Sequence, residues 1–311
     1  MTVLRLELQD PAPADAAAPE QAEQAGVAEV SEPATAEPAP EGPPLQDLPW
    51  VLGLLLAGVM VWRALRRGLG RVVLGHEAAP RRELAGWWVI EMITVTFAVF
   101  AVATLAIMAQ GTFGGWALEG LVATDVGLAG GVALAAVLAR RTTSGASREA
   151  FGLVAPAGPL REAAYGAVAL AVSTPAIVGV MLLVPFVFAL FGAAQAPQTV
   201  LLEILALEGP LLAGAFVLAA LVGPLLEEVL FRGFVQPACV DRVGPGGGIV
   251  FTSLLFASIH GPDAMLPIFA LSLVLGHLRH RTGGLVAPIV AHCLWKGTTL
   301  ALAIQGTVPV S

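Results

Sequence analysis

Charged residues are scarce in this sequence, and several residue types that support particular functions are nearly missing. Only 13% of the 311 residues are charged, 57% are hydrophobic and the mean hydropathy is +0.81, whereas soluble proteins have about 25% charged residues. The chain has a single lysine, Lys296, and a net charge of −7; outside the acidic amino-terminal segment 13 acids stand against 15 bases, and no nucleic-acid partner follows from such a balance. Its two cysteines, Cys239 and Cys293, show no CxxC spacing, which argues against a disulfide framework and a zinc finger. This composition is typical of a multi-spanning membrane protein.

The amino-terminal segment differs from the rest of the chain. Ten of the 23 acidic residues precede Leu48, and Arg5 is the only base there. The segment is rich in Ala, Pro and Glu, so it buries too little apolar surface to offset the entropy cost of ordering. We predict a disordered acidic tail over residues 1–46, and no signal peptide, because no basic segment precedes an apolar run. Amino-terminal transmembrane helices over 47–163 and a core over 164–311 complete the predicted domains.

The remainder is predicted to be an all-α, polytopic transmembrane helical bundle. A membrane span needs about 20 apolar residues, and we count about eight apolar segments. A further short run, residues 195–207, carries Glu203 and is interpreted as an interfacial or re-entrant helix. No repeat of 20 to 50 residues is recognisable, so no solenoid is indicated. The expected spans are 48–64, 86–109, 117–139, 164–191, 209–234, 247–261, 264–278 and 284–305.

The arginines predict the orientation of the bundle. Basic residues stay on the cytoplasmic side of a membrane while successive spans alternate in direction. Fourteen arginines follow the odd-numbered spans, which places all of them on one side. We therefore expect a multi-pass protein of a bacterial-type inner or plasma membrane, with both termini outside. The arginines are Arg63, Arg66, Arg67, Arg71, Arg81, Arg82, Arg140, Arg141, Arg148, Arg161, Arg232, Arg242, Arg279 and Arg281.

Two adjacent carboxylates interrupt the fifth apolar segment. Residues 223–237 read GPLLEEVLFRGFVQP, with Glu227, Glu228 and Arg232 as the only charges. Glu228 and Arg232 are i,i+4 neighbours that can form a structural ion pair, whereas Glu227 lies about 100° away around the helix. Since surroundings of low dielectric disfavour a charged carboxylate, the unpaired Glu227 is the candidate general base.

Two histidines are expected at the same depth as these carboxylates. Glu228 and His260 each lie 13 residues from the loop 241–247, or about 20 Å along a helix, and His292 lies about 14 Å into the last span. One carboxylate and two imidazoles can activate a water, stabilise an oxyanion or hold a divalent metal. No HExxH motif is present, so a gluzincin-type site is not indicated.

The polar residues of the earlier spans have a simpler interpretation. Glu91, Glu119 and Asp125 are isolated from one another in the sequence. Polar side chains commonly form hydrogen bonds between membrane helices. We therefore interpret these three as helix-end or interhelical hydrogen-bonding groups.

The carboxyl-terminal third resembles a known family. The order EExxxR (Glu227, Glu228, Arg232), then FxxxH (Phe256, His260), then the element that begins at His292 is similar to that of the CAAX-protease and bacteriocin-processing (CPBP, Abi) family of intramembrane proteases. The flanking segments FRGFVQ and LGHLRHRTGGLVAPIVAH also resemble family blocks. The likeness covers about residues 205–300, and the spans before residue 164 carry no signature of their own.

The resemblance implies an intramembrane endopeptidase whose active site opens to the cytoplasmic side. Glu227 and His260 would activate the water, and His292 would stabilise the oxyanion. A divalent metal, zinc first, would use Glu227, His260 and His292 as ligands. The family's Asn, four residues after the second histidine, is Lys296 here. Lys296 could serve the oxyanion, but a nearby cation disfavours a metal.

Three functions remain open at this point. The first is hydrolysis of a peptide bond in a membrane-embedded or lipidated (CAAX-type) protein within the lipid bilayer, by a CPBP-type protease that is a metalloendopeptidase if a metal is used. The alternative is an inactive family member that acts as a membrane scaffold or immunity-type binding protein, because of Lys296. A transporter with a proton relay of buried acids and histidines is the third.

Overall fold

The computed structural model describes residues 51–54, 56–61, 116–142, 149, 151–193 and 199–306. Within these residues it contains helices and no β-strand, which confirms the all-α fold class. The acidic tail expected over residues 1–46 and the span expected over 86–109 lie outside the described residues.

The described helices lie close to the bounds of the expected apolar segments. The first is a short helix, Val51–Val61. The short run expected over 195–207 is present as the seven-residue helix α5. The others follow in chain order as α3 (Trp116–Thr142), α4 (Pro159–Leu190), α5 (Thr199–Leu205), α6 (Gly209–Val217), η2 (Leu218–Val222), α7 (Gly223–Glu228), η3 (Val229–Val235), α8 (Gln236–Ser258), α9 (Pro262–Thr282) and α10 (Val286–Ile304).

Three stretches of the described residues are long and apolar enough to cross a membrane: Pro159–Leu190, Gly209–Ser258 and Val286–Ile304. Together with the composition they indicate an integral membrane protein. The total of eight spans and the orientation with both termini outside stay predictions.

The run from Gly209 to Ser258 changes direction at Gly244. This residue has φ 75° and ψ 171°, a conformation that glycine adopts without a Cβ clash, and Pro245 follows it at the start of the next helical arm. The bend falls in the loop expected between the fifth and sixth spans. A Cβ on Gly248 would lie 2.5 Å from the backbone N of Val240, so the two arms pack tightly across the bend.

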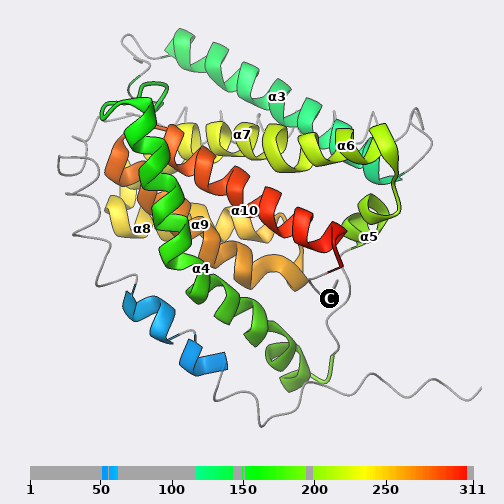
Figure 1. Ribbon diagram of the computed structural model, residues 1–311. Helices are drawn as coiled ribbons and strands as arrows, with labels where there is room; N and C mark the ends of the chain where they lie inside the picture. Colours follow the sequence, from blue (N-terminus) through cyan, green and yellow to red (C-terminus); the bar gives the residue numbers. More distant parts are fainter. Residues whose placement is uncertain are drawn as a thin grey trace, which may run out of the picture. The chain divides into compact units, whose positions relative to one another are not determined.

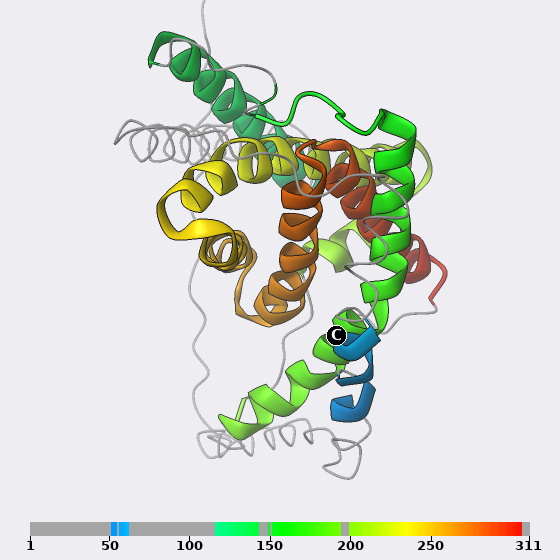
Figure 2. The ribbon, with the colours of Figure 1, turned by 90° about the vertical axis from the view of Figure 1, so that its left-hand side faces the viewer.

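The helices that carry the polar residues pack around one another. Helix α4 contacts α9 and α10, helix α9 contacts α8, and α7 lies between α3 and α10. Figure 1 shows α3 running alongside α6 and α7, and Figure 2 shows α8 and α9 next to each other. This arrangement brings the middle of α7 towards α10.

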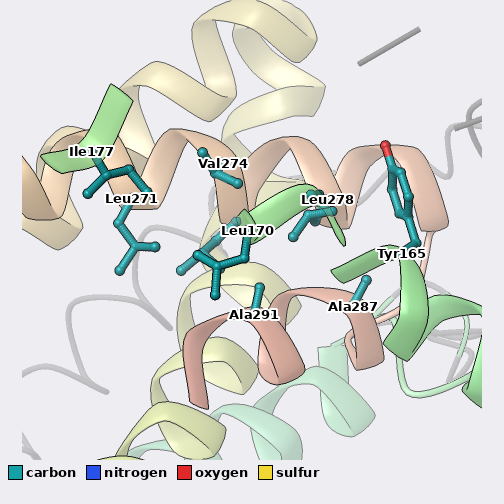
Figure 3. Close-up of a cluster of buried hydrophobic side chains, with 10 residues drawn as sticks. Tyr165, Leu170, Ile177, Leu271, Val274, Leu278, Ala287 and Ala291 are labelled. Carbon is teal, nitrogen blue, oxygen red and sulfur yellow. The ribbon is translucent and has the colours of Figure 1, made fainter. Parts of the chain in front are cut away.

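A cluster of apolar side chains from α4, α9 and α10 forms the main buried core beside the polar residues. Figure 3 shows side chains of α4 and α9 pointing towards the small alanines of α10. The fully buried members of this apolar cluster include Tyr165, Leu275 and Ala291.

Two glycines let these helices approach closely. A Cβ on Gly166 of α4 would overlap the carbonyl oxygen of Ala287 in α10. A Cβ on Gly276 of α9 would lie 2.9 Å from Cγ2 of Ile249. The side-chain amide of Gln236 donates to the carbonyl oxygen of Gly276 at 2.8 Å, which ties α8 to α9.

Candidate active site

The two adjacent glutamates of α7 have different surroundings. Glu228 is fully buried, whereas the side chain of Glu227 is 15% exposed. Successive residues of a helix lie about 100° apart, so the two carboxylates leave the helix in different directions. Glu228 points into the packing between helices, and Glu227 keeps some access to its surroundings.

Arg232 holds Glu228 and is itself held by α9. Its Nη1 donates to Glu228 Oε1 at 2.9 Å, and both side chains have no exposed surface. Its Nη2 donates to the hydroxyl of Ser272 at 2.8 Å, and its guanidinium lies 4.6 Å from the centre of the Phe256 ring. A buried cation needs such a set of acceptors and ring contacts to replace water.

His292 contacts both glutamates. Its Nδ1 lies 2.8 Å from Glu228 Oε1, the oxygen that also accepts from Arg232. Its Nε2 lies 3.6 Å from Glu227 Oε2, beyond the length of a direct hydrogen bond. Both of these facing atoms are buried and have no hydrogen-bond partner among the described residues.

His260 lies in a turn rather than inside a helix, which differs from the sequence expectation. Helix α8 ends at Ser258, and Gly261 with φ 84° and Pro262 begin the turn into α9. His260 Nδ1 lies 2.7 Å from the carbonyl oxygen of Phe256, and its ring packs against the Phe256 ring with centroids 4.7 Å apart. Because a carbonyl only accepts, Nδ1 is the donor in this contact and Nε2 is free to face other groups.

Phe256 links the two histidines. Its ring contacts the ring of His292 edge to face, with centroids 5.9 Å apart, and it also packs against His260. Glu227, Lys296 and His292 all lie near enough to His260 to interact with it electrostatically, so the predicted residues share one environment. Lys296 is half-buried and follows His292 by one turn of α10.

Two residues of this region are not placed at the site by the sequence: Ser272 carries no prediction, and Asp125 is predicted only as a helix-end or interhelical hydrogen-bonding group. Ser272 of α9 accepts from Arg232, and nothing in its sequence context marks it. Asp125 of α3 is 8% exposed, and its Oδ1 lies 3.2 Å from the point where a Cβ on Gly223 would be, one turn before Glu227. Its Oδ2 has no hydrogen-bond partner among the described residues, and its charge interacts with that of Glu227. Both residues reach this region only through packing between helices that are distant in the sequence, so no local sequence pattern predicts their position.

The expected metal ligands do not form a metal site in this arrangement. Among the described residues no three His, Cys, Asp or Glu side chains lie close enough together to hold a metal ion. Glu227 and His292 face each other, but His260 does not complete a set with them. We therefore derive no chemical step through a metal.

The comparison with protein families finds a match in the part of the chain that carries this site. Residues 209–298 match the family described as type II CAAX prenyl endopeptidase Rce1-like. No curated protein and no solved structure matches the chain. The matched segment contains Glu227, Glu228, Arg232, His260 and His292. This match supports the resemblance of the carboxyl-terminal third to the CAAX-protease and bacteriocin-processing family of intramembrane proteases.

Proposed function

We propose that this protein hydrolyses a peptide bond in a membrane-embedded or lipidated protein, using a water that lies beside Glu227 and His292 and donates a hydrogen bond to each. One observation carries this proposal: Glu227 Oε2 and His292 Nε2 face each other at 3.6 Å, and both are buried without a hydrogen-bond partner among the described residues. The family match supports a CAAX-type substrate. The lipid bilayer would be the second partner, with the site reached from the cytoplasmic side.

Glu228 determines which ring nitrogen of His292 carries a hydrogen. Glu228 pairs with Arg232 and is therefore a carboxylate, which only accepts hydrogen bonds. Nδ1 of His292 must then be the donor in the 2.8 Å contact, and we assign the ring the neutral form, in which Nε2 carries a lone pair. Glu227 Oε2 and His292 Nε2 are thus both acceptors, and a water molecule can donate one hydrogen to each.

The proposed reaction uses this water as the nucleophile. Its oxygen bonds to the carbonyl carbon of the substrate while Glu227 accepts one of its protons, and the carbonyl oxygen becomes an oxyanion. When the intermediate collapses, the C–N bond breaks, and Glu227 returns the proton to the leaving amine. Glu227 is therefore first a general base and then a general acid.

Lys296 is the donor that we assign to the oxyanion. An ammonium has three hydrogens to donate, and Lys296 lies on the same side of α10 as His292 because the two are i,i+4 neighbours. His260 donates through Nδ1 to Phe256, so its Nε2 is an acceptor that can take a hydrogen from the substrate, since both hydrogens of the water go to Glu227 and His292. These assignments differ from those that the family resemblance implies: His292 rather than His260 holds the water with Glu227, and Lys296 rather than His292 serves the oxyanion.

There are two alternatives to a metal-free protease: an inactive binding protein and a metal-dependent protease. The residue at the family's Asn position is Lys296, and this departure favours the alternative of an inactive member that binds proteins in the membrane. A divalent metal, zinc first, also stays a prediction, because a substrate that moves His260 towards Glu227 would bring a third ligand. Both alternatives predict results that differ from those of the metal-free protease.

The test is cleavage of membrane-tethered peptides by the purified protein in lipid. We expect Glu227→Gln to fold and purify normally yet lose cleavage by about 100-fold or more, the usual scale for a general base. The matched control is Glu208→Gln, the same change at an exposed residue before α6. Equal activity of Glu227→Gln and wild type would remove Glu227 from the mechanism.

Two further arms separate the alternatives. Loss of cleavage after treatment with a chelator, restored by zinc, would establish the metal. Cleavage by Lys296→Asn but not by wild type would show that the natural chain is an inactive binding protein.

A further inference from the structure

The helix that carries the glutamates contains two π-helical turns, and each one ends two residues before a proline. In η2 the N–H of Gly223 donates to the carbonyl of Leu218, and Pro224 follows. In η3 the N–H of Gln236 donates to the carbonyl of Phe231, and Pro237 follows. A proline ring inside a helix clashes with the carbonyl four residues earlier, and a wider turn relieves that clash.

The second of these turns leaves one carbonyl without its main-chain donor. In a π-helical ladder each carbonyl accepts from the N–H five residues later, so the carbonyl of Arg232 would accept from residue 237. That residue is Pro237, which has no N–H. The N–H of Gln236 is already bound to Phe231. A buried carbonyl in this position needs a donor from elsewhere.

Arg279 of α9 supplies that donor. Its Nε donates to the carbonyl oxygen of Arg232 at 3.0 Å, and Arg279 is only 8% exposed. Gly152 makes room for the guanidinium, because a Cβ there would lie 2.8 Å from Arg279 Cζ. The charge of the fully buried Glu162 in α4 acts on Arg279, which compensates for burying the cation.

The carbonyl that Arg279 holds belongs to the residue that fixes the catalytic histidine. Arg232 donates to Glu228 Oε1, and the same oxygen contacts Nδ1 of His292. His292 in turn faces Glu227 at 3.6 Å. A shift of the Arg232 backbone would therefore move the acceptor pair that we assign to the water.

We propose that Arg279 is a positioning residue, which replaces the hydrogen bond that Pro237 cannot donate and so fixes the turn that carries Arg232. Its effect on catalysis rests on the proposed function, whereas its effect on the turn does not. If Arg279 acted only by pairing with Glu162, its importance would not depend on Pro237. The two possibilities therefore differ in whether Arg279 and Pro237 are coupled.

The experiment is a double-mutant cycle of Arg279→Met and Pro237→Ala in the full chain. Alanine at position 237 gives Arg232 a main-chain donor in either helix type: its own N–H if the turn stays wide, or that of Gln236 if the turn becomes α-helical. We expect Arg279→Met alone to lower kcat about tenfold, the scale of one buried hydrogen bond, with KM little changed. In the Pro237→Ala background the same change should lower kcat by less than about threefold.

A readout without catalysis distinguishes failure of this proposal from failure of the protease proposal. Hydrogen–deuterium exchange of peptides from residues 229–240 should be faster in Arg279→Met than in wild type. It should be no faster in Arg279→Met/Pro237→Ala than in Pro237→Ala alone. Arg242→Met, the same change at an exposed arginine of α8, is the control and should leave exchange and kcat as in wild type. An equal effect of Arg279→Met in both backgrounds, by exchange or by kcat, would overturn the proposal.

Discussion

Replacing Arg232 by methionine tests the buried centre of the site most directly. Methionine has nearly the length of the arginine stem, so the substitution removes the charge and its hydrogen bonds with little change in packing volume. It abolishes the bond to Glu228 Oε1 at 2.9 Å, the bond to Ser272 Oγ at 2.8 Å and the stacking on Phe256. Glu228 would stay fully buried with His292 as the remaining partner of its Oε1.

The structure sets the expected magnitude. Removing one partner of a buried ion pair costs about 3–5 kcal/mol, because the other charge is left uncompensated. No other donor replaces Arg232, because the second oxygen of Glu228, Oε2, is buried and has no hydrogen-bond partner among the described residues. The loss is a large part of the about 5–15 kcal/mol that stabilises a folded protein. On the scale of soluble domains of 150–250 residues, it lowers Tm by about 6 °C or more.

The assay is thermal unfolding of purified protein in lipid, followed by tryptophan fluorescence. Arg242→Met serves as the exposed control and should unfold as wild type does. The double variant Glu228→Gln/Arg232→Met removes both charges and should regain at least half of the lost stability, because no unpaired charge stays buried. An Arg232→Met protein as stable as wild type, or a double variant no better than the single one, would refute the buried ion-pair reasoning.

Three further substitutions test separate parts of the structure. Gly166→Ala places a methyl against the carbonyl of Ala287 and should cost about 1–3 kcal/mol of unfolding free energy, whereas Gly214→Ala, which meets nothing within 4 Å, should be neutral or stabilising; equal Tm values for the two would contradict the close packing of α4 on α10. Asp125→Asn removes a buried charge next to Glu227 and should raise stability by about 1 kcal/mol, and a lower Tm would show that the carboxylate has a partner that it needs. Lys296→Met should lower kcat about 100-fold or more with KM nearly unchanged if it serves the oxyanion, and a change in KM alone would assign it to substrate binding.

The contacts that depend on helical period could be predicted from the sequence. The spacing of Glu228 and Arg232 already placed both on one side of a helix, and the structure puts them 2.9 Å apart. Counting residues from the loop at 241–247 for Glu228, and from Gly283 for His292, predicts that the two lie near mid-depth, and their side chains are in contact. These inferences use only the rise and turn of a helix, which vary little from one protein to another.

The contacts that depend on packing between distant helices could not be predicted. Ser272 and Asp125 approach the site from α9 and α3, and no pattern in one sequence shows which side of a helix meets which neighbour. His260 was placed inside a helix, although the Gly261–Pro262 pair that follows it is a turn signal. The two π-helical turns were also missed, because the sequence expectation read residues 209–234 as a regular helix.

The adjacency of the two glutamates has a physical reason in this arrangement. One oxygen of Glu228 serves both Arg232 and His292, so the ion pair that holds the helix also orients the histidine. A carboxylate used in this way is fully buried and cannot also face the substrate. Glu227, about 100° further around the helix, reaches Nε2 on the other edge of the same imidazole. A single glutamate could orient His292 or act as its partner towards water, but it could not do both.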